Sequence, residues 1–206
     1  RLAFPIFAFL LVEGFFHTRD LKRYVLRLLL LALLSEIPFD LMYAGTSFFP
    51  FHQNVIWTFL IALFCMWVIE RVKRRGNLWL TLLAAAGMSL AGWLAGTIAM
   101  VDYYGAGVLT VLLFYLFRGG LWWQRLGQAA GMIWINCGLL AGLVLQVNIL
   151  GLTVEFPQQG FALLALIPIW LYRGRQGYHS RWVQTACYLF YPVHILVLAM
   201  MVRFLL

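Results

Sequence analysis

RLAFPIFAFLLVEGFFHTRDLKRYVLRLLLLALLSEIPFDL, residues 1–41, consists of two apolar runs joined by a basic turn. Four ionisable residues, Glu13, His17, Glu36 and Asp40, lie within the apolar runs. A charged side chain inside a bilayer costs at least about 2.5 kcal/mol, so such residues are buried against partners and mark sites of chemistry or transport. The stretch therefore predicts half of an active site inside a membrane.

Composition supports a membrane protein for the whole chain. Hydrophobic residues make up 64% of the 206 residues and charged residues only 11%, whereas soluble domains are about half apolar and a quarter charged. The net charge of +8 comes from short basic clusters between apolar runs, which is typical of topology signals rather than of nucleic-acid binding. We predict an all-α, polytopic helical bundle that contacts membrane lipids and no nucleic acid.

The three cysteines indicate no metal site. Cys65, Cys137 and Cys187 are widely spaced inside apolar segments, a pattern that fits neither a zinc site nor a disulfide framework. We expect them to be packing residues and expect no bound metal.

Eight apolar segments approach the length of about 20 residues that a membrane helix needs. No linker or repeat separates them, so a single domain over residues 1–206 is expected. The predicted segments are 2–17, 24–44, 54–72, 78–98, 103–118, 127–149, 159–173 and 182–204.

The loops between these segments predict the orientation. The odd-numbered loops hold 13 of the 15 Lys and Arg residues, and the second, fourth and sixth loops, near 45–53, 99–102 and 150–158, hold none. The positive-inside rule then places the odd loops in the cytoplasm and the even loops outside. The basic residues are Arg19, Lys22, Arg23, Arg27, Arg71, Lys73, Arg74, Arg75, Arg118, Arg125, Arg173, Arg175 and Arg181.

The same rule puts Arg1 outside the cell, although the sequence has neither an initiating Met nor a signal peptide ahead of it. One further helix before Arg1 would resolve this. We therefore expect the sequence to be truncated at its N-terminus.

The ionisable residues fall at two depths. Glu13 and His17, four residues apart on one helix face, lie near the cytoplasmic end of the first segment. They are either catalytic or an interfacial pair that reaches water beside Arg19. Both alternatives remain open.

Glu36 and Asp40 share one face of the outer half of the second segment, and Pro38 between them removes a backbone donor and bends the helix. His194, in the motif YPVH, is expected at a similar depth in the last segment. We predict that Glu36, Asp40 and His194 form one catalytic site, although each of them could instead be a buried structural group.

The outer loops supply further polar residues. His52 is a second candidate base, and Gln53 and Asn54 open the third segment, where free backbone donors favour an anionic or acyl oxygen. Asp102, Tyr103 and Tyr104 line the next outer turn. These residues are candidates for binding the substrate.

Four of these motifs together resemble one family. The motifs RLAFPIFAFLLVEGFFHTR, KRYVLRLLLLALLSEIPFDL, HQN at 52–54 and YPVH at 191–194 are similar, in order and spacing, to the TraX family of conjugal-transfer membrane proteins. The resemblance covers nearly the whole chain. It implies an integral inner-membrane acetyltransferase of the membrane acyltransferase group, with one more N-terminal helix that carries an Asp-His pair.

In that reading acetyl-CoA is the acyl donor and the acceptor is a pilin-like peptide or an envelope glycan. The donor is cytosolic and anionic, so the basic first loop is expected to contact its phosphates through Arg19, Lys22, Arg23 and Arg27. A histidine or carboxylate takes the acceptor proton, with His194 or His52 as the base and Asp40 or Glu36 beside it. Asn54 or Gln53 would hold the developing oxyanion.

A different class is a proton-coupled secondary transporter, since buried Glu, Asp and His residues also form proton relays. The sequence lacks the visible repeats and paired broken helices typical of such transporters. A non-catalytic scaffold for pilus assembly would leave the buried carboxylates without a role.

Overall fold

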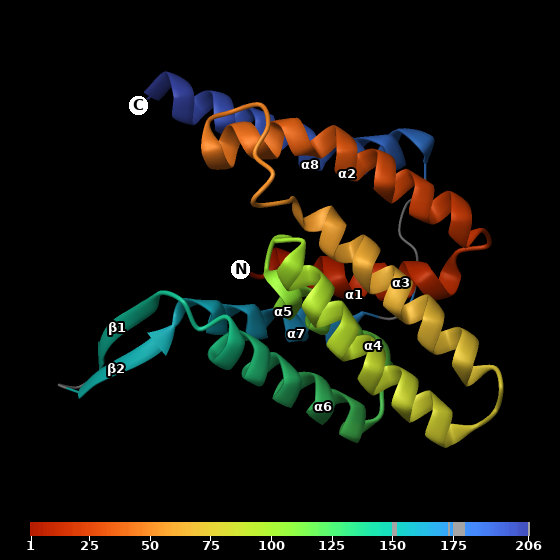
Figure 1. The fold of residues 1–206 in the computed structure, drawn as a ribbon. Coiled ribbons are helices and arrows are strands. Elements are labelled where there is room, and N and C mark those ends of the chain that lie inside the picture. Colours follow the sequence, from red (N-terminus) through yellow and green to blue (C-terminus); the bar gives the residue numbers. More distant parts are fainter. Residues whose placement is uncertain (150–151, 173, 175–179, 206) are drawn as a thin grey trace.

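The structure is a computed structural model that describes residues 1–149, 152–172, 174 and 180–205. Helices dominate it, as predicted (Figure 1). The helices are α1 (Ala3–His17), α2 (Leu21–Ala44), α3 (Val55–Lys73), α4 (Leu78–Ile98), α5 (Tyr104–Leu116), α6 (Trp122–Ile133), a π-helical turn (Trp134–Leu139), a 3-10 helix (Gln158–Ala165), α7 (Leu166–Leu171) and α8 (Arg181–Leu205).

Polar caps explain where three of the helices begin. The Asp20 carboxylate accepts a hydrogen bond from the backbone N–H of Arg23 at 3.1 Å and starts α2. Asn54 and Asn77 cap α3 and α4 in the same way. Such caps satisfy backbone donors that the first helical turn leaves free. The bounds of α4 agree with the predicted segment 78–98.

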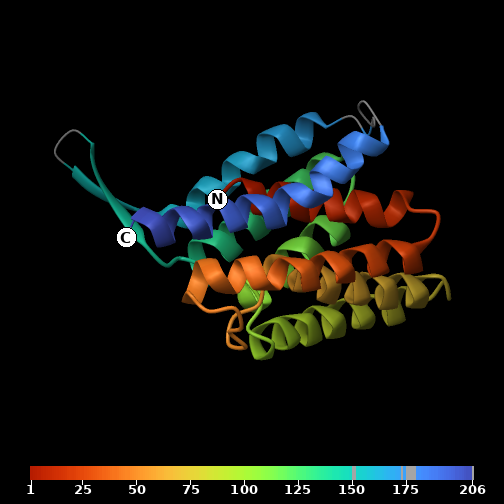
Figure 2. The same cartoon turned by 90° about the horizontal axis from the view of Figure 1, so that it is seen from above.

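The core forms where α5 packs against α1, α3 and α4. Its buried residues include Val108, Val111 and Phe114. α2 packs on α3 and along α8. α2 and α8 form a pair on one side of the bundle, as Figures 1 and 2 show. α4 and α8 are mostly exposed and apolar, which suits contact with lipid.

The connecting turns gather at two ends of the bundle. At one end, the turn before α2 lies near the turn after α5, because Glu13 contacts Arg118. At the other end, the backbone of Gln53 pairs with Val101 and so joins the α2–α3 loop to the α4–α5 loop. The first and fifth loops therefore meet at one end, and the second and fourth loops meet at the other.

The number of membrane spans predicted from the sequence was too high. Among the described residues, three helices are long and apolar enough to cross a membrane: Val55–Lys73, Leu78–Ile98 and Thr185–Phe204. Three apolar helices of 10–17 residues are too short. α2 is long, but its first turns carry Lys22, Arg23 and Arg27, which lower its hydropathy.

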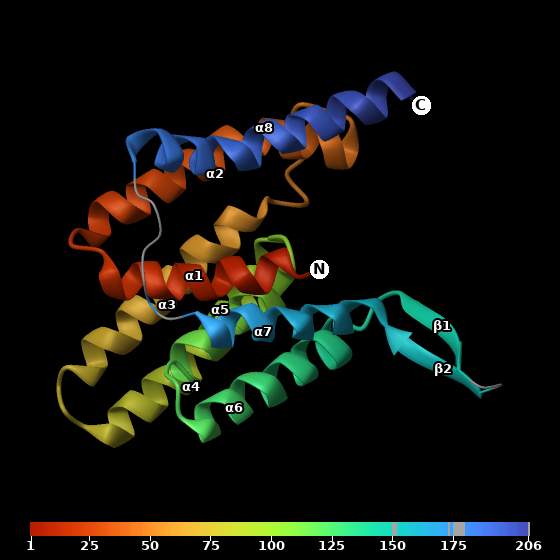
Figure 3. The ribbon, with the colours of Figure 1, turned by 180° about the vertical axis from the view of Figure 1, so that it is seen from behind.

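The predicted sixth segment, 127–149, was wrong in its second half. The helix ends in the π-helical turn at Leu139, and β1 (Val144–Ile149) then pairs antiparallel with β2 (Leu152–Pro157). This hairpin extends away from the helices (Figure 3). Gly138 and Gly142 weaken a helix there, and the β-branched residues that follow favour a strand.

The predicted seventh segment, 159–173, is a 3-10 helix followed by the short α7 beside α1 (Figure 3). Arg173 and Arg175, assigned to the seventh loop, lie outside the described residues, as does the tip of the sixth loop at 150–151.

Candidate functional site

The end of the bundle where α2 meets α3 holds a buried polar cluster built around Glu36. The side-chain amide of Asn54 and the indole Nε1 of Trp57 both donate to Oε2 of Glu36, the second at 2.9 Å. Oε1 of Glu36 is buried and has no hydrogen-bond partner among the described residues. The carboxyl group is therefore held by one oxygen, and the other is left free.

Asn54 orients Glu36 because its own side chain is fully engaged. Asn54 is completely buried; its Oδ1 accepts from the backbone N–H of Ile56 at 3.0 Å, and its Nδ2 also donates to the Ala32 carbonyl at 2.9 Å. One side chain thus caps α3 and ties it to α2. The predicted oxyanion role of Asn54 competes with these contacts.

His52 lies in an aromatic enclosure at the same end. Its ring stacks on Tyr43, with centroids 4.5 Å apart, and on Phe39 at 5.6 Å. Nε2 lies 3.8 Å from Oδ1 of Asp102, too far for a hydrogen bond but close enough for charge interaction. Nδ1 is buried and has no partner in the described part of the chain.

The two aspartates of this region, Asp40 and Asp102, differ in their hydrogen-bond partners. Asp40 is 1% exposed, its Oδ2 accepts from the backbone N–H of Phe49 at 2.9 Å, and its Oδ1 has no partner among the described residues. Asp102 lies in the loop between α4 and α5. Burial raises the pKa of Asp102, and His52, the backbone N–H of Tyr103 and Arg1 oppose that rise.

The α4–α5 loop is held in a strained shape. The backbone N–H of Gln53 donates to the carbonyl of Met100, and the backbone N–H of Asp102 donates to the carbonyl of Gln53, each at 2.9 Å. Met100, Tyr103 and Tyr104 all have positive φ angles, which are uncommon for residues other than Gly. The Tyr103 ring stacks on Phe4, and the Tyr104 ring tilts toward His52. The Gln53 amide bonds to the Pro50 carbonyl. The predicted outer residues thus lie together.

His194 is not joined to this cluster. Nδ1 of His194 lies 3.1 Å from the carbonyl oxygen of Phe190, and its ring stacks on the Phe190 ring. Within the described residues no hydrogen bond or ion pair links His194 to Glu36 or Asp40.

In the same motif, Tyr191 packs against the core, and its ring centroid lies 5.9 Å from that of His194. Sequence reasoning missed Tyr191, although it opens the motif YPVH, because ionisable side chains drew attention to His194.

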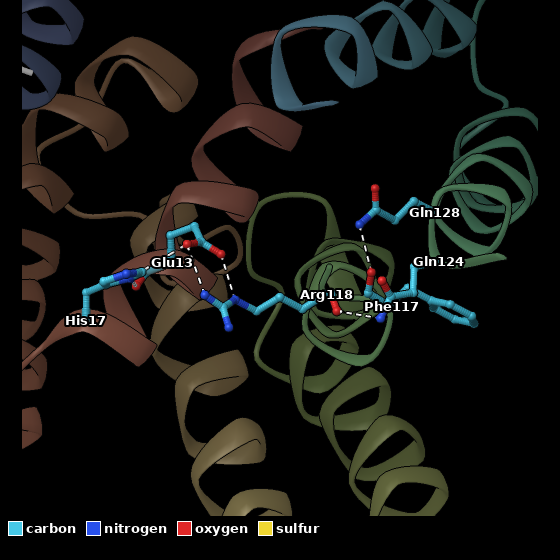
Figure 4. A network of polar contacts seen from close by, with 6 residues as sticks. All are labelled: Glu13, His17, Phe117, Arg118, Gln124 and Gln128. Atoms are coloured by element: carbon cyan, nitrogen blue, oxygen red, sulfur yellow. Dashed lines mark hydrogen bonds and ion pairs between the residues drawn. The ribbon is translucent and has the colours of Figure 1, made fainter. Parts of the chain in front are cut away.

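Glu13 and His17 lie at the opposite end of the bundle and form part of an ion-pair network (Figure 4). Arg118 Nε lies 2.7 Å from Oε1 of Glu13 and Arg118 Nη2 lies 3.2 Å from Oε2. The guanidinium also covers the Phe16 ring at 4.2 Å. Nδ1 of His17 contacts the Glu13 carbonyl oxygen at 2.8 Å. Glu13 is thus held in an ion pair with Arg118, a partner that neither of the two predicted alternatives named.

The backbone around Arg118 is held from α6. Gln124 donates to the Arg118 carbonyl and Gln128 to the Phe117 carbonyl, both at 2.9 Å (Figure 4). Gln128 also accepts from the indole N–H of Trp170. Two consecutive backbone carbonyls, those of Phe117 and Arg118, are thus anchored to α6.

A pocket of about 460 Å³ lies near the start of α2, and Arg19, Arg23 and Arg27 contribute to its lining. Lys22 is outside it. Arg23 is partly neutralised by Asp20, whose Oδ2 lies 3.0 Å from Nε. Nine residues separate Arg27 from Glu36, about two and a half helical turns, so the pocket and the Glu36 cluster lie on opposite faces of α2.

No group of three or more His, Cys, Asp or Glu residues suited to a metal ion occurs in the described part of the chain.

Comparison with known proteins places these features in context. The family model described as TraX protein matches residues 1–202. A probable fimbrial assembly protein, FimC of serogroup H1, from Dichelobacter nodosus is 30% identical over 217 residues, an alignment that covers all of this chain and 82% of that protein. No solved structure matches the chain.

Proposed function

Because this chain belongs to the TraX family, we propose that it is a membrane-embedded acetyltransferase that moves an acetyl group from acetyl-CoA to a cell-envelope acceptor. The observation that supports this proposal is the environment of the Glu36 carboxyl group. Asn54 and Trp57 hold one of its oxygens, and the other oxygen is buried and has no partner among the described residues. A proton acceptor fixed in this way is what acyl transfer to an amine or hydroxyl requires.

The acceptor is proposed to belong to pilus or fimbria biogenesis. The match to a probable fimbrial assembly protein supports this role. A pilin-like peptide is the first candidate and an envelope glycan the second.

The chemistry needs one base and one oxyanion stabiliser. The nitrogen or oxygen of the acceptor attacks the thioester carbonyl carbon, the carbon–sulfur bond breaks, and CoA leaves as a thiolate that takes up a proton. Glu36 Oε1 or the free Nδ1 of His52 accepts the proton that the acceptor loses. Oδ1 of Asp102 lies 3.8 Å from Nε2 of His52, on the side of the ring away from Nδ1. Asp40, anchored by the Phe49 N–H, is proposed to keep the His52 side of the site polar.

The position of His194 weakens its case as the base. Its Nδ1 is already directed to the Phe190 carbonyl, so its role in the site requires a rotation of the side chain. Glu36 and His52 carry the proposal without that rearrangement.

The donor is proposed to enter from the cytoplasmic side. Guanidinium groups bind phosphate in a bidentate manner, and the pocket lined by Arg19, Arg23 and Arg27 has the volume and charge for such groups. Because this pocket lies on the face of α2 opposite to Glu36, the acyl arm must pass around α2. The inner membrane, with the basic loops in the cytoplasm, is the proposed location.

One observation favours a second function. Oε1 of Glu36 and Oδ1 of Asp40 are four residues apart on α2 and both lack partners among the described residues, which also suits a proton relay in a transporter. The two functions separate in one experiment: an acetyltransferase releases CoA from acetyl-CoA only when acceptor is present, and Glu36→Gln and His52→Gln abolish this release. A transporter instead moves protons in liposomes without consuming acetyl-CoA.

A further inference from the structure

A groove between α6 and α7 is separate from both the Glu36 cluster and the arginine-lined pocket. The two helices lie side by side in Figure 3, and the indole N–H of Trp170 in α7 donates to Oε1 of Gln128 in α6 at 2.8 Å. The groove has a volume of about 320 Å³. We call it the α6–α7 groove, and its lining consists of Gly120, Trp122, Arg125, Leu126, Ala129 and Trp170.

One face of α6 forms a wall of the α6–α7 groove. Its lining residues are spaced i, i+3, i+4 and i+7, which places side chains on one side of a helix. A different face of α6 is packed in the bundle through the buried residues Gln128 and Met132. The face that borders the groove is apolar except for one cation, and it carries Trp122, Arg125, Leu126 and Ala129.

Gln128 holds the opposite wall in place. This side chain is 2% exposed; its Nε2 donates to the Phe117 carbonyl at 2.9 Å (Figure 4), and its Oε1 accepts from Trp170. Because that bond uses the indole N–H of Trp170, the rest of the ring is left as an apolar surface. At Gly120 an added Cβ would meet no atom within 4 Å, so the space beside it is open.

Arg125 gives the groove its charge. The residue is exposed, and its guanidinium forms no ion pair among the described residues. Every other lining residue is apolar or glycine, so a free, strongly hydrated anion would find one charge and no further polar side chain. A ligand with a phosphate head and a hydrocarbon tail matches both parts of the lining, because guanidinium groups bind phosphate and the rings bind hydrocarbon.

The groove adjoins the end of the bundle that the loop charges assign to the cytoplasm. Gly120 lies two residues after Arg118, which binds Glu13 at that end. Exposed tryptophans such as Trp122 are enriched where a membrane meets water. Three helices of the described chain are long and apolar enough to cross a membrane, so phospholipids are the anions expected beside this groove.

We propose that the α6–α7 groove binds one anionic phospholipid. The headgroup phosphate pairs with Arg125, and an acyl chain lies along Trp122, Leu126 and Trp170. Basic pockets between membrane helices are suited to anionic headgroups. This site does not depend on the proposed acetyl transfer.

The test is native mass spectrometry of the purified full chain in a neutral detergent, titrated with dioleoyl phosphatidylglycerol or with dioleoyl phosphatidylcholine. We expect the wild type to retain one phosphatidylglycerol at concentrations where it does not retain phosphatidylcholine. Arg125→Gln should weaken binding of phosphatidylglycerol about fivefold, the factor that one basic residue contributes near anionic lipid. It should leave binding of phosphatidylcholine unchanged.

Arg75→Gln is the matched control, since it removes an exposed charge of the third loop that lies outside the groove. This variant should bind both lipids as the wild type does. Without added lipid, Arg125→Gln should have the stability of the wild type in detergent, because the guanidinium has no ion-pair partner in the described part of the chain.

A second variant tests the apolar part of the groove. Gly120→Leu should fill the open space and weaken binding of both lipids, whereas Gly87→Leu, at a glycine with equally open surroundings, should not. Glycerol 3-phosphate, which has the phosphate without acyl chains, should not displace phosphatidylglycerol. Equal retention of the two lipids by the wild type, unchanged affinity in Arg125→Gln, or displacement by glycerol 3-phosphate would each overturn the assignment. No acetyl-CoA is present, so these outcomes do not bear on the proposed acetyl transfer.

Discussion

Arg118 binds both carboxylate oxygens of Glu13, at 2.7 and 3.2 Å, across 105 residues of sequence. The pair ties the end of α1 to the turn after α5, and the Glu13 side chain is only 13% exposed. Parallel hydrogen bonds between a guanidinium and a carboxylate are among the stronger polar contacts in proteins. We therefore assign Glu13 to stability at the predicted cytoplasmic end.

Arg118→Gln should destabilise the protein, because it leaves a buried carboxylate without its charge partner. Hydrogen bonds to charged groups are worth about 1.5–3 kcal/mol, and the partial exposure of Arg118 reduces that value. We expect a loss of about 1–2 kcal/mol in the free energy of unfolding, measured by denaturant titration in detergent.

Arg125→Gln is the matched control, since Arg125 forms no ion pair among the described residues. The double variant Glu13→Gln/Arg118→Gln should be closer to wild type than Arg118→Gln, because it removes the unpaired charge. Equal stability of Arg118→Gln and wild type would show that the ion pair contributes nothing.

Asn54→Ala should be among the most harmful single changes. It removes the cap of α3, worth about 1 kcal/mol, and it leaves the Ala32 carbonyl and Oε2 of Glu36 short of a donor at about 1–3 kcal/mol. We expect a marked fall in the denaturation midpoint. Asn77→Ala removes an exposed cap of α4, so this variant should lose only the stabilisation that the cap provides.

The raised pKa of Asp102 predicts a pH dependence of stability. The folded state holds this proton at pH values where the unfolded state, with a pKa of about 3.9, has released it. The contribution of Asp102 is thus present below pH 4 or so and is lost as pH rises through the folded pKa.

Asp102→Asn removes this titration, so the variant should gain stability relative to wild type as pH rises above about 4. Denaturation midpoints measured across that range check the sign, and the same measurement in a His52→Gln background removes the imidazole that lies 3.8 Å from Asp102. A wild type that becomes relatively more stable as pH rises would contradict the burial of Asp102.

Arg27→Gln and Arg23→Gln should raise the KM for acetyl-CoA with little change in kcat, as loss of uniform binding does. Lys22→Gln is the matched control, because Lys22 is adjacent but outside the pocket lining. Unchanged KM values in both arginine variants would assign the pocket to another anion, such as a lipid headgroup.

Sequence patterns predicted the helices best where polar caps and loops bounded the apolar runs. The segment 78–98 agrees with α4 because Asn77 begins the helix. The segment 127–149 was wrong because hydropathy does not distinguish an apolar helix from an apolar strand. Helix length, and not hydropathy alone, reduced eight predicted spans to three among the described residues.

Local spacing predicted which residues share a helix face but not which helices meet. The outer loop residues His52 and Asp102 do lie together. The pairing of Glu13 with Arg118 could not be predicted, because Arg118 looked like one loop charge among many. Likewise, Tyr191 and His194 lie in the same motif, but the sequence does not show that Tyr191 packs against the core while the His194 ring stacks on Phe190.

The central claim is acyl transfer at the Glu36 cluster, and the most direct test is CoA release by purified full chain in membrane vesicles with radiolabelled acetyl-CoA and a pilin-like peptide. We predict that release of CoA and labelling of the peptide depend on each other, and that Glu36→Gln abolishes both without lowering the amount of protein in the membrane. Labelling at the wild-type rate by the Glu36→Gln variant, or no CoA release by the wild type, would contradict the account.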